Sequence, residues 1–280
     1  MPFLFDHVHL LDGALARAGA YMALAMIGGI GLWELRFRRP LVWEGYFRWS
    51  ALALGTIALL LALNSAASNG EDYFNAEAMA VAGIGDMAEL LIHSAFGRAW
   101  LVYWLFLLLA AVNPGQRLGW ICALVMLGAL VFASHAGELG MMHWVFWIDL
   151  VHMACALLWL GGLTLMLVFR LSGSEWISPV EFSFFSSVAL PLFAVTLASG
   201  LTRAVLQYME EGGLVLTYAA MLILKLAAVT AVAVCAWFLR RLLQRPGFSM
   251  ARYDNGLSLE FFFALTLLLF TALLTQLLPG

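Results

Sequence analysis

The chain has 280 residues, of which 64% are hydrophobic and 11% are charged, and its net charge is −3. Soluble domains are about half apolar and one quarter charged, so this composition excludes a soluble protein and indicates a polytopic membrane protein. No basic patch suggests a nucleic-acid partner. The three cysteines, Cys122, Cys155 and Cys235, lie in separate apolar segments without a CxxC pair, which makes a disulfide framework unlikely.

Apolar segments of membrane-spanning length follow one another along the chain. A spanning helix needs about 20 mostly apolar residues. The sequence therefore predicts an all-α bundle of eight transmembrane helices that forms a single domain over residues 1–280. The predicted spans are 13–35, 49–68, 93–112, 118–135, 147–169, 182–206, 214–240 and 257–278. An acidic N-terminal segment precedes the first span, so we expect this span to be retained rather than cleaved as a signal peptide.

Basic residues concentrate in the connections that follow the first, third, fifth and seventh spans. Ten of the fourteen Lys and Arg residues fall there: Arg36, Arg38, Arg39, Arg48, Arg117, Arg170, Arg240, Arg241, Arg245 and Arg252. The other connections are acidic. Because basic loops stay in the cytoplasm, we expect both termini on the outer side, which is the periplasm if the host is a Gram-negative bacterium. The expected location is the bacterial inner membrane.

The longest connection, residues 69–92, lies on the predicted outer side. Its stretch AEAMAVAGIGDMAELLIH mixes apolar and acidic residues. This pattern favours a short helix lying against the outer surface of the bundle. A partly ordered surface loop is the alternative.

All six histidines are predicted to lie on the same outer side. Three of them, His135, His143 and His152, belong to the hairpin between the fourth and fifth spans. Met141 and Met142 precede His143, and Met153 follows His152. Imidazole with thioether sulfur is a ligand set that favours copper, as Cu(I) or Cu(II), over zinc. A solvated or hydrogen-bonded side chain is the alternative reading for each histidine taken alone.

His152 is the strongest candidate, because ionisable groups at membrane depth are costly and usually functional. Asp149 lies three residues earlier, on the same stripe of a helix. A carboxylate there is expected to accept the second ring N–H of His152 and so fix the tautomer of a metal-bound imidazole.

The remaining histidines supply further candidate ligands. His7 and His9 form an HxH segment beside Asp6, which is able to chelate Cu(II). His93 enters the third span at the outer level and is a candidate to complete a ring of ligands with His135 and His152.

Two basic residues interrupt apolar runs. Lys225, within the seventh span, is expected to pair with an acid or a carbonyl inside the bundle. Arg203 is expected to extend outward to the lipid interface. Glu260, near the start of the eighth span, is expected to be interfacial.

Several segments resemble the copper resistance protein D family of bacterial inner-membrane proteins, over roughly residues 90–278. The segments that carry the resemblance are GRAW (97–100), SHAGE (134–138), DLVHMACALLWLGGL (149–163), FSFFSSVALPLFAVTLASGL (182–201), YAAMLILKL (218–226) and LSLEFFF (257–263). The first two spans match the family pattern only loosely, and no copper-carrier domain is fused to the chain.

The resemblance implies an eight-helix protein that moves copper across the inner membrane after receiving it from a periplasmic carrier of the CopC type. It implies that Ser134 to Gly137, Asp149 and His152 lie on the side where copper enters, and that Lys225 and Glu260 are structural matches.

The sequence therefore predicts a copper-binding membrane transport protein and not an enzyme. It contains no P-loop pattern GxxxxGK[ST]. One alternative is a b-type cytochrome, with His135 or His93 pairing with His152 on a haem. Another is an assembly factor that loads copper onto a partner without transporting it.

Overall fold

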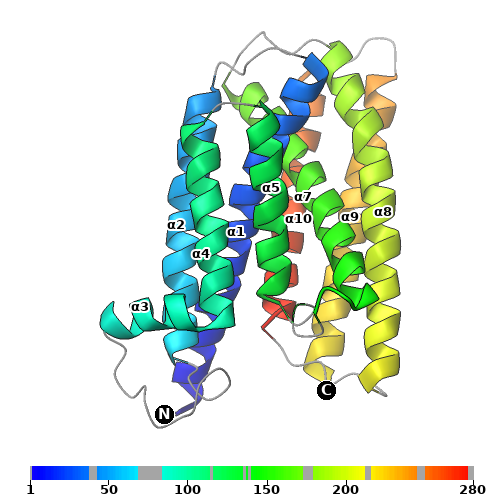
Figure 1. Cartoon of the computed structure of the whole chain (residues 1–280). Helices are drawn as coiled ribbons and strands as arrows, with labels where there is room; N and C mark the ends of the chain where they lie inside the picture. The colour runs from blue at the N-terminus through cyan, green and yellow to red at the C-terminus, as the bar shows by residue number, and fades with distance from the viewer. Residues whose placement is uncertain are drawn as a thin grey trace.

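The computed structural model describes residues 2–37, 43–68, 84–113, 116–134, 137, 140–172, 179–211, 216–244 and 250–276. Within these ranges all regular structure is helical (Figure 1). The helices are α1 (Pro2–Phe37), α2 (Glu44–Ser68), α3 (Ile84–His93), α4 (Ala95–Val112), α5 (Gln116–Phe132), α7 (Trp144–Leu171), α8 (Pro179–Glu211), α9 (Leu216–Leu243) and α10 (Met250–Leu274). The predicted all-α class is confirmed.

Seven of the described helices are long and apolar enough to cross a membrane, namely α1, α2, α4, α7, α8, α9 and α10. The apolar part of α5 is shorter and covers Arg117–Phe132. At 1.5 Å per residue the 17 residues of α5 extend about 26 Å. The chain is therefore a multi-pass helical membrane protein.

The long helices run alternately up and down the bundle (Figure 1). As a result α1 begins at the same end of the bundle at which α10 terminates. The short α3 lies across this end, approximately perpendicular to the long helices. We call it the α3 end and the other the opposite end. The starts of α4, α7 and α9 also lie at the α3 end.

Several helices extend beyond the predicted spans. α2 begins at Glu44 rather than residue 49, α7 at Trp144 rather than 147, and α10 at Met250 rather than 257. Apolarity marks the part of a helix that lies in hydrocarbon, whereas backbone hydrogen bonding continues into polar residues beyond it. Arg48, which the sequence placed in a connection, is consequently part of α2.

A serine separates the surface helix from the span that follows it. Ser94 Oγ accepts a hydrogen bond of 2.7 Å from the Gly97 amide and donates one of 2.7 Å to the Leu90 carbonyl. Ser94 thereby caps α4 and ends α3. A helix is present at residues 84–93, residues 69–83 of the same predicted segment lie outside the described residues, and the predicted third span begins two residues later than expected, at Ala95.

α1 is the central helix of the bundle and packs against α2, α5, α7 and α10. In its apolar window 67% of the residues are buried, compared with 6% for α8 at the periphery. Small residues allow this close packing. Where α1 crosses α7, a Cβ atom added to Gly161 would contact the backbone carbonyl of Ala25, and one added to Gly29 would lie 2.6 Å from the Gly161 carbonyl oxygen.

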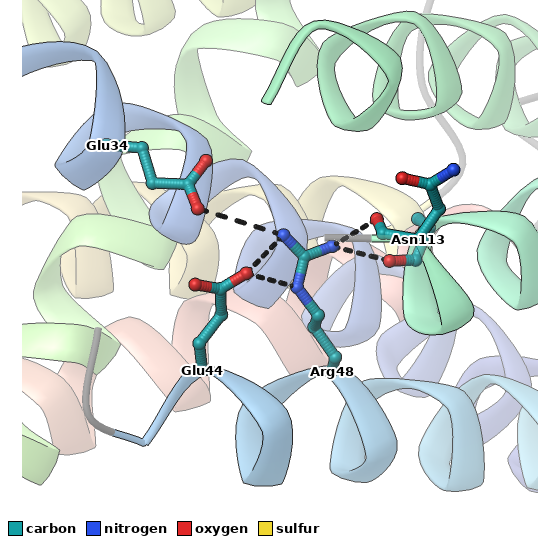
Figure 2. A network of polar contacts seen from close by, with 5 residues as sticks. Glu34, Glu44, Arg48 and Asn113 are labelled. Atoms are coloured by element: carbon teal, nitrogen blue, oxygen red, sulfur yellow. Dashed lines mark hydrogen bonds and ion pairs between the residues drawn. The ribbon is translucent and has the colours of Figure 1, made fainter. Parts of the chain in front are cut away.

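A buried ion network joins α1, α2 and α4 (Figure 2). Arg48 is 4% exposed. Its Nε and Nη2 atoms lie 2.7 Å and 2.6 Å from Glu44 Oε1, and Nη2 lies 3.9 Å from Glu34 Oε1. Its Nη1 donates to the carbonyls of Ala110 at 2.5 Å and Asn113 at 3.2 Å. A residue that the sequence assigned to a loop thus has its guanidinium enclosed by three helices.

A second ion pair connects α7 to α10. Arg170 donates from Nε to Asp254 Oδ1 at 2.6 Å and from Nη2 to Oδ2 at 2.8 Å. This bidentate geometry is the strongest form of an arginine–carboxylate contact. It fixes the last turn of α7 against the first turns of α10.

Candidate functional site

The contact between α7 and α8 contains a polar cluster in an otherwise apolar region. His152 lies eight residues after the start of α7, which is about 12 Å along the helix from the α3 end. Its Nδ1 atom lies 3.0 Å from the carbonyl oxygen of Thr196 and 3.1 Å from Ser199 Oγ, both on α8. Because a carbonyl only accepts hydrogen bonds, Nδ1 carries the proton. The lone pair of the imidazole is therefore on Nε2.

Gly200 provides the space for this imidazole. A Cβ atom added to Gly200 would lie 2.9 Å from His152 Cε1 and 3.3 Å from its Nδ1. The ring thus lies directly on the backbone of α8, and the absence of a side chain at residue 200 brings Nδ1 within reach of the Thr196 carbonyl.

Replacing Gly200 by alanine is expected to displace the His152 ring and lengthen its bond to Thr196. The ring nitrogens then lose their fixed tautomer, which nitrogen NMR of the imidazole would detect. Helix propensity alone favours alanine by about 1 kcal/mol, so the protein should remain folded. A spectrum identical to that of the wild type would contradict the proposed packing.

Asp149 makes a different contact from the one expected. Its Oδ2 atom lies 3.5 Å from Nε of Arg203 on α8, and both side chains are largely buried. Within the described residues no hydrogen bond joins Asp149 to His152, since His152 Nδ1 is directed at the Thr196 carbonyl. Arg203 was expected to extend outward, and it forms this ion pair instead. Two expectations are therefore wrong: Asp149 does not accept a hydrogen bond from His152, and Arg203 does not extend outward to the lipid interface.

Lys225 brings α9 to the same cluster. It interacts electrostatically with Asp149 and with His152. The expected acidic neighbour is thus present, although the described contacts include no ion pair within 4 Å for Lys225. Nearby, the Tyr218 hydroxyl of α9 donates to Gln207 Oε1 of α8 at 2.6 Å. Polar groups of α7, α8 and α9 meet here.

His143 lies too far from His152 to share a metal ion with it. It precedes α7 as the N-cap, where its Nδ1 accepts a hydrogen bond of 3.4 Å from the Val145 amide. Nine residues correspond to about 13 Å along the helix and to opposite faces, whereas metal–nitrogen bonds are about 2 Å long. The hairpin therefore does not gather these two imidazoles around one ion.

The three methionines of the hairpin are in different environments. Met141 and Met142 are 51% and 101% exposed in the turn before α7. Met153 is partly buried and packs against the core. The first two thioethers are accessible to an incoming ion, and the third is largely enclosed.

The remaining histidines are dispersed or lie outside the described part of the chain. His93 ends α3, which packs against α2 and α4, on the side of the bundle away from α8 (Figure 1). His93 and His152 are thus not brought together. His7 and His9 lie in the first turns of α1, but their side chains are outside the described residues, as is all of His135. No group of three or more His, Cys, Asp or Glu side chains suited to a metal occurs among the residues described.

Glu260 is more deeply buried than expected. It is 5% exposed and lies ten residues into α10, about 15 Å from the start of the helix. It interacts electrostatically with Cys235 of α9 and with Tyr253. Glu260 is therefore an acidic group of the bundle interior, and its depth in the membrane stays a prediction.

The α8 half of the cluster was missed at the level of sequence, although a signal was present. Thr196, Ser199, Arg203 and Gln207 follow one another at intervals of three or four residues in an apolar helix. This spacing places them on one face. A polar stripe on a peripheral membrane helix indicates the face that turns toward the protein.

Comparison with known protein families finds a match to the model described as Copper resistance protein D over residues 180–274. The match covers α8, α9 and α10 and includes Thr196, Ser199, Arg203 and Lys225. Asp149 and His152 lie outside it. No curated protein and no solved structure matches the chain. The expected resemblance is confirmed over residues 180–274, which are similar to the copper resistance protein D model.

Proposed function

We propose that this protein binds copper at the outer face of the inner membrane through His152 and conducts it across the bilayer. The observation that carries the proposal is the hydrogen bond from His152 Nδ1 to the Thr196 carbonyl, which lies in the copper resistance protein D segment. Histidines that bind metals typically donate their second N–H to a carbonyl or carboxylate in this way. Copper is the transported ion in this mechanism rather than a resident cofactor.

Soft ligands would complete the copper site. Thioether sulfur favours Cu(I), and Met141 and Met142 are exposed at the α3 end, where they are suited to capture an arriving ion. Met153 is adjacent to His152 in the chain. The proposed ligands on the entry side also include His135, His7, His9 and His93. We propose that His143 binds an arriving copper ion other than the one bound by His152.

The positive charge near His152 disfavours the binding of a copper ion there. Asp149 offsets Arg203, which leaves Lys225 as the remaining positive group near the imidazole. We expect copper to arrive at His152 only as Lys225 releases its proton or moves toward Asp149. In this proposal Asp149 offsets the positive charges of Lys225 and Arg203, and it does not contact the imidazole directly.

The proposed topology has eight spans, with α5 as the eighth, and has both termini in the periplasm. It is supported by the shared end at which α1 begins and α10 terminates (Figure 1) and by the basic residues near the opposite end. The α3 end is then the periplasmic face, where a carrier of the CopC type would deliver copper. No nucleotide-binding motif is present in the sequence, so we propose transport driven by a gradient or by exchange between carriers, without enzymatic activity.

Replacing His152 by alanine is expected to weaken Cu(I) binding by at least 10- to 100-fold, the loss typical even for outer partners of a metal site. Binding is measured by competition with a Cu(I) chelator on purified protein in lipid nanodiscs. The control is His143→Ala, which removes an imidazole at the same end that does not share an ion with residue 152. It should change the affinity by less than His152→Ala does.

Three results would contradict parts of this proposal. Equal copper affinity in the His152→Ala variant and the wild type would exclude His152 as a ligand. A Soret band in the purified protein would indicate haem instead. Copper binding without any change in cellular copper content after deletion of the gene would indicate a copper-loading factor rather than a transporter.

A further inference from the structure

A polar cavity lies at the α3 end, separate from the His152 cluster. It has a volume of about 70 Å³ and lies between α1, α2, α4, the segment after α5 and the end of α10. Its lining includes Gly13, Arg17, Ser65, Trp100, Ser134 and Gln276. A water molecule needs roughly 10–15 Å³ of cavity, so there is room for several waters or for one small ion.

Among the described residues that line this cavity, Arg17 is the only one with a charged side chain, and it is 6% exposed. Its Nη2 donates to the carbonyl of Ala133, just beyond the last turn of α5. The negative end of the α5 dipole offsets part of the charge. Its Nη1 is buried and has no hydrogen-bond partner among the described residues. A guanidinium at this depth therefore retains both an unsatisfied donor and most of a positive charge.

Trp100 also lines this cavity. It is 1% exposed, and its Nε1 has no hydrogen-bond partner in the part of the chain that the structure describes. By contrast, the hydroxyls of Ser134 and Thr275 already donate to backbone carbonyls, each at 2.7 Å. The two buried polar atoms without partners here are both N–H donors. Among the described residues, neither of these two donors has an acceptor within hydrogen-bond distance.

Acidic side chains do not supply this acceptor in the described part of the chain. Among the described residues no carboxylate is recorded within ion-pair distance of Arg17, and Asp12, one turn earlier in α1, accepts instead from Asn64 Nδ2 at 3.1 Å. A buried charge without a partner costs several kcal/mol. An anion in the cavity would remove this cost and would accept from both Arg17 Nη1 and Trp100 Nε1.

We propose that this cavity binds one small monovalent inorganic anion of the size of chloride, bromide or nitrate. The ion accepts hydrogen bonds from Arg17 and Trp100 and locks α1, α4 and α5 together at the α3 end. The site shares no residue with the His152 cluster and does not depend on copper binding.

The test is the melting temperature of the purified protein in lipid nanodiscs, titrated with sodium chloride against sodium gluconate at constant ionic strength. A ligand that binds only the folded state raises the melting temperature in a saturable way. We expect this rise with chloride, bromide and nitrate, and its loss in Arg17→Gln. Arg98→Gln is the matched control, because Arg98 is an exposed arginine at the same end, and it should retain the response.

A second variant covers the case in which Arg17→Gln does not fold. Trp100→Phe keeps most of the ring packing and removes one N–H donor to a charged group. It should raise the half-saturating chloride concentration by about ten-fold or more. Identical melting curves in chloride and gluconate would overturn the proposal and leave a cavity filled with water. An unchanged chloride response in Arg17→Gln or Trp100→Phe would overturn it as well.

Discussion

Replacing Arg48 by alanine is expected to lower the free energy of unfolding by about 3–5 kcal/mol, the cost of breaking a buried ion pair by removing one partner. The carboxylates of Glu34 and Glu44 would remain largely buried without the guanidinium that joins them (Figure 2). The carbonyls of Ala110 and Asn113 would lose their donor as well. Reversible unfolding in mixed detergent micelles measures this difference.

Further variants of the Arg48 network distinguish the contribution of the Arg48 charge to stability from that of its hydrogen-bonding geometry. Arg48→Lys keeps the charge but not the fork that reaches both Glu44 and Ala110, so it should recover only part of the loss. Adding Glu34→Gln and Glu44→Gln to Arg48→Ala removes the unpaired charges and should also restore part of it. Arg240→Ala, at an exposed arginine of α9, is the control and should change stability by less than about 0.5 kcal/mol. A loss in Arg48→Ala no larger than in this control would contradict the network.

The approximate positions of the membrane helices along the chain could be predicted from the sequence, because whether a segment forms such a helix depends on the residues of that segment. An apolar run of about 20 residues forms a helix in lipid regardless of its neighbours. The helix ends were less accurate, as α2 and α10 show, because polar residues continue a helix past the membrane boundary. The burial of Arg48 was missed because, apart from Glu44 on the same helix, its partners come from α1 and α4, and hydropathy carries no information about them.

The candidate site was predicted only in part, because the sequence shows local properties of a residue but not which residues of other helices it contacts. His152 was identified from its depth and chemistry, which are local properties. Its partner Thr196 lies 44 residues away on α8, and only the packing of α7 against α8 decides that this carbonyl, rather than the Asp149 carboxylate, meets the ring. Arg17 was overlooked although it interrupts an apolar run as Lys225 does, because nothing in the sequence reveals the cavity beside it.

Replacing Gly161 by valine is expected to produce the second large effect, because it forces apart α1 and α7. A Cβ atom at residue 161 would overlap the carbonyl of Ala25, which is backbone and has no alternative rotamer to adopt. Overpacking of a core costs about 1–3 kcal/mol and sometimes more, and a rigid neighbour places this variant at the upper end. α1 is central, so the displacement should extend to α2, α5 and α10. The expected result is a much lower melting temperature and yield.

A pair of alanine variants isolates this contact from the general effect of losing a glycine. Gly128 also lies within an apolar helix, α5, but a Cβ atom there would meet nothing within 4 Å. Gly128→Ala should therefore be neutral or stabilising by up to about 1 kcal/mol through helix propensity, whereas Gly161→Ala should be destabilising. The two substitutions change the same atoms in opposite surroundings, so a difference in the sign of the stability change reports the α1–α7 contact itself. Equal changes at the two glycines would mean that α1 and α7 are not in backbone contact at residue 161.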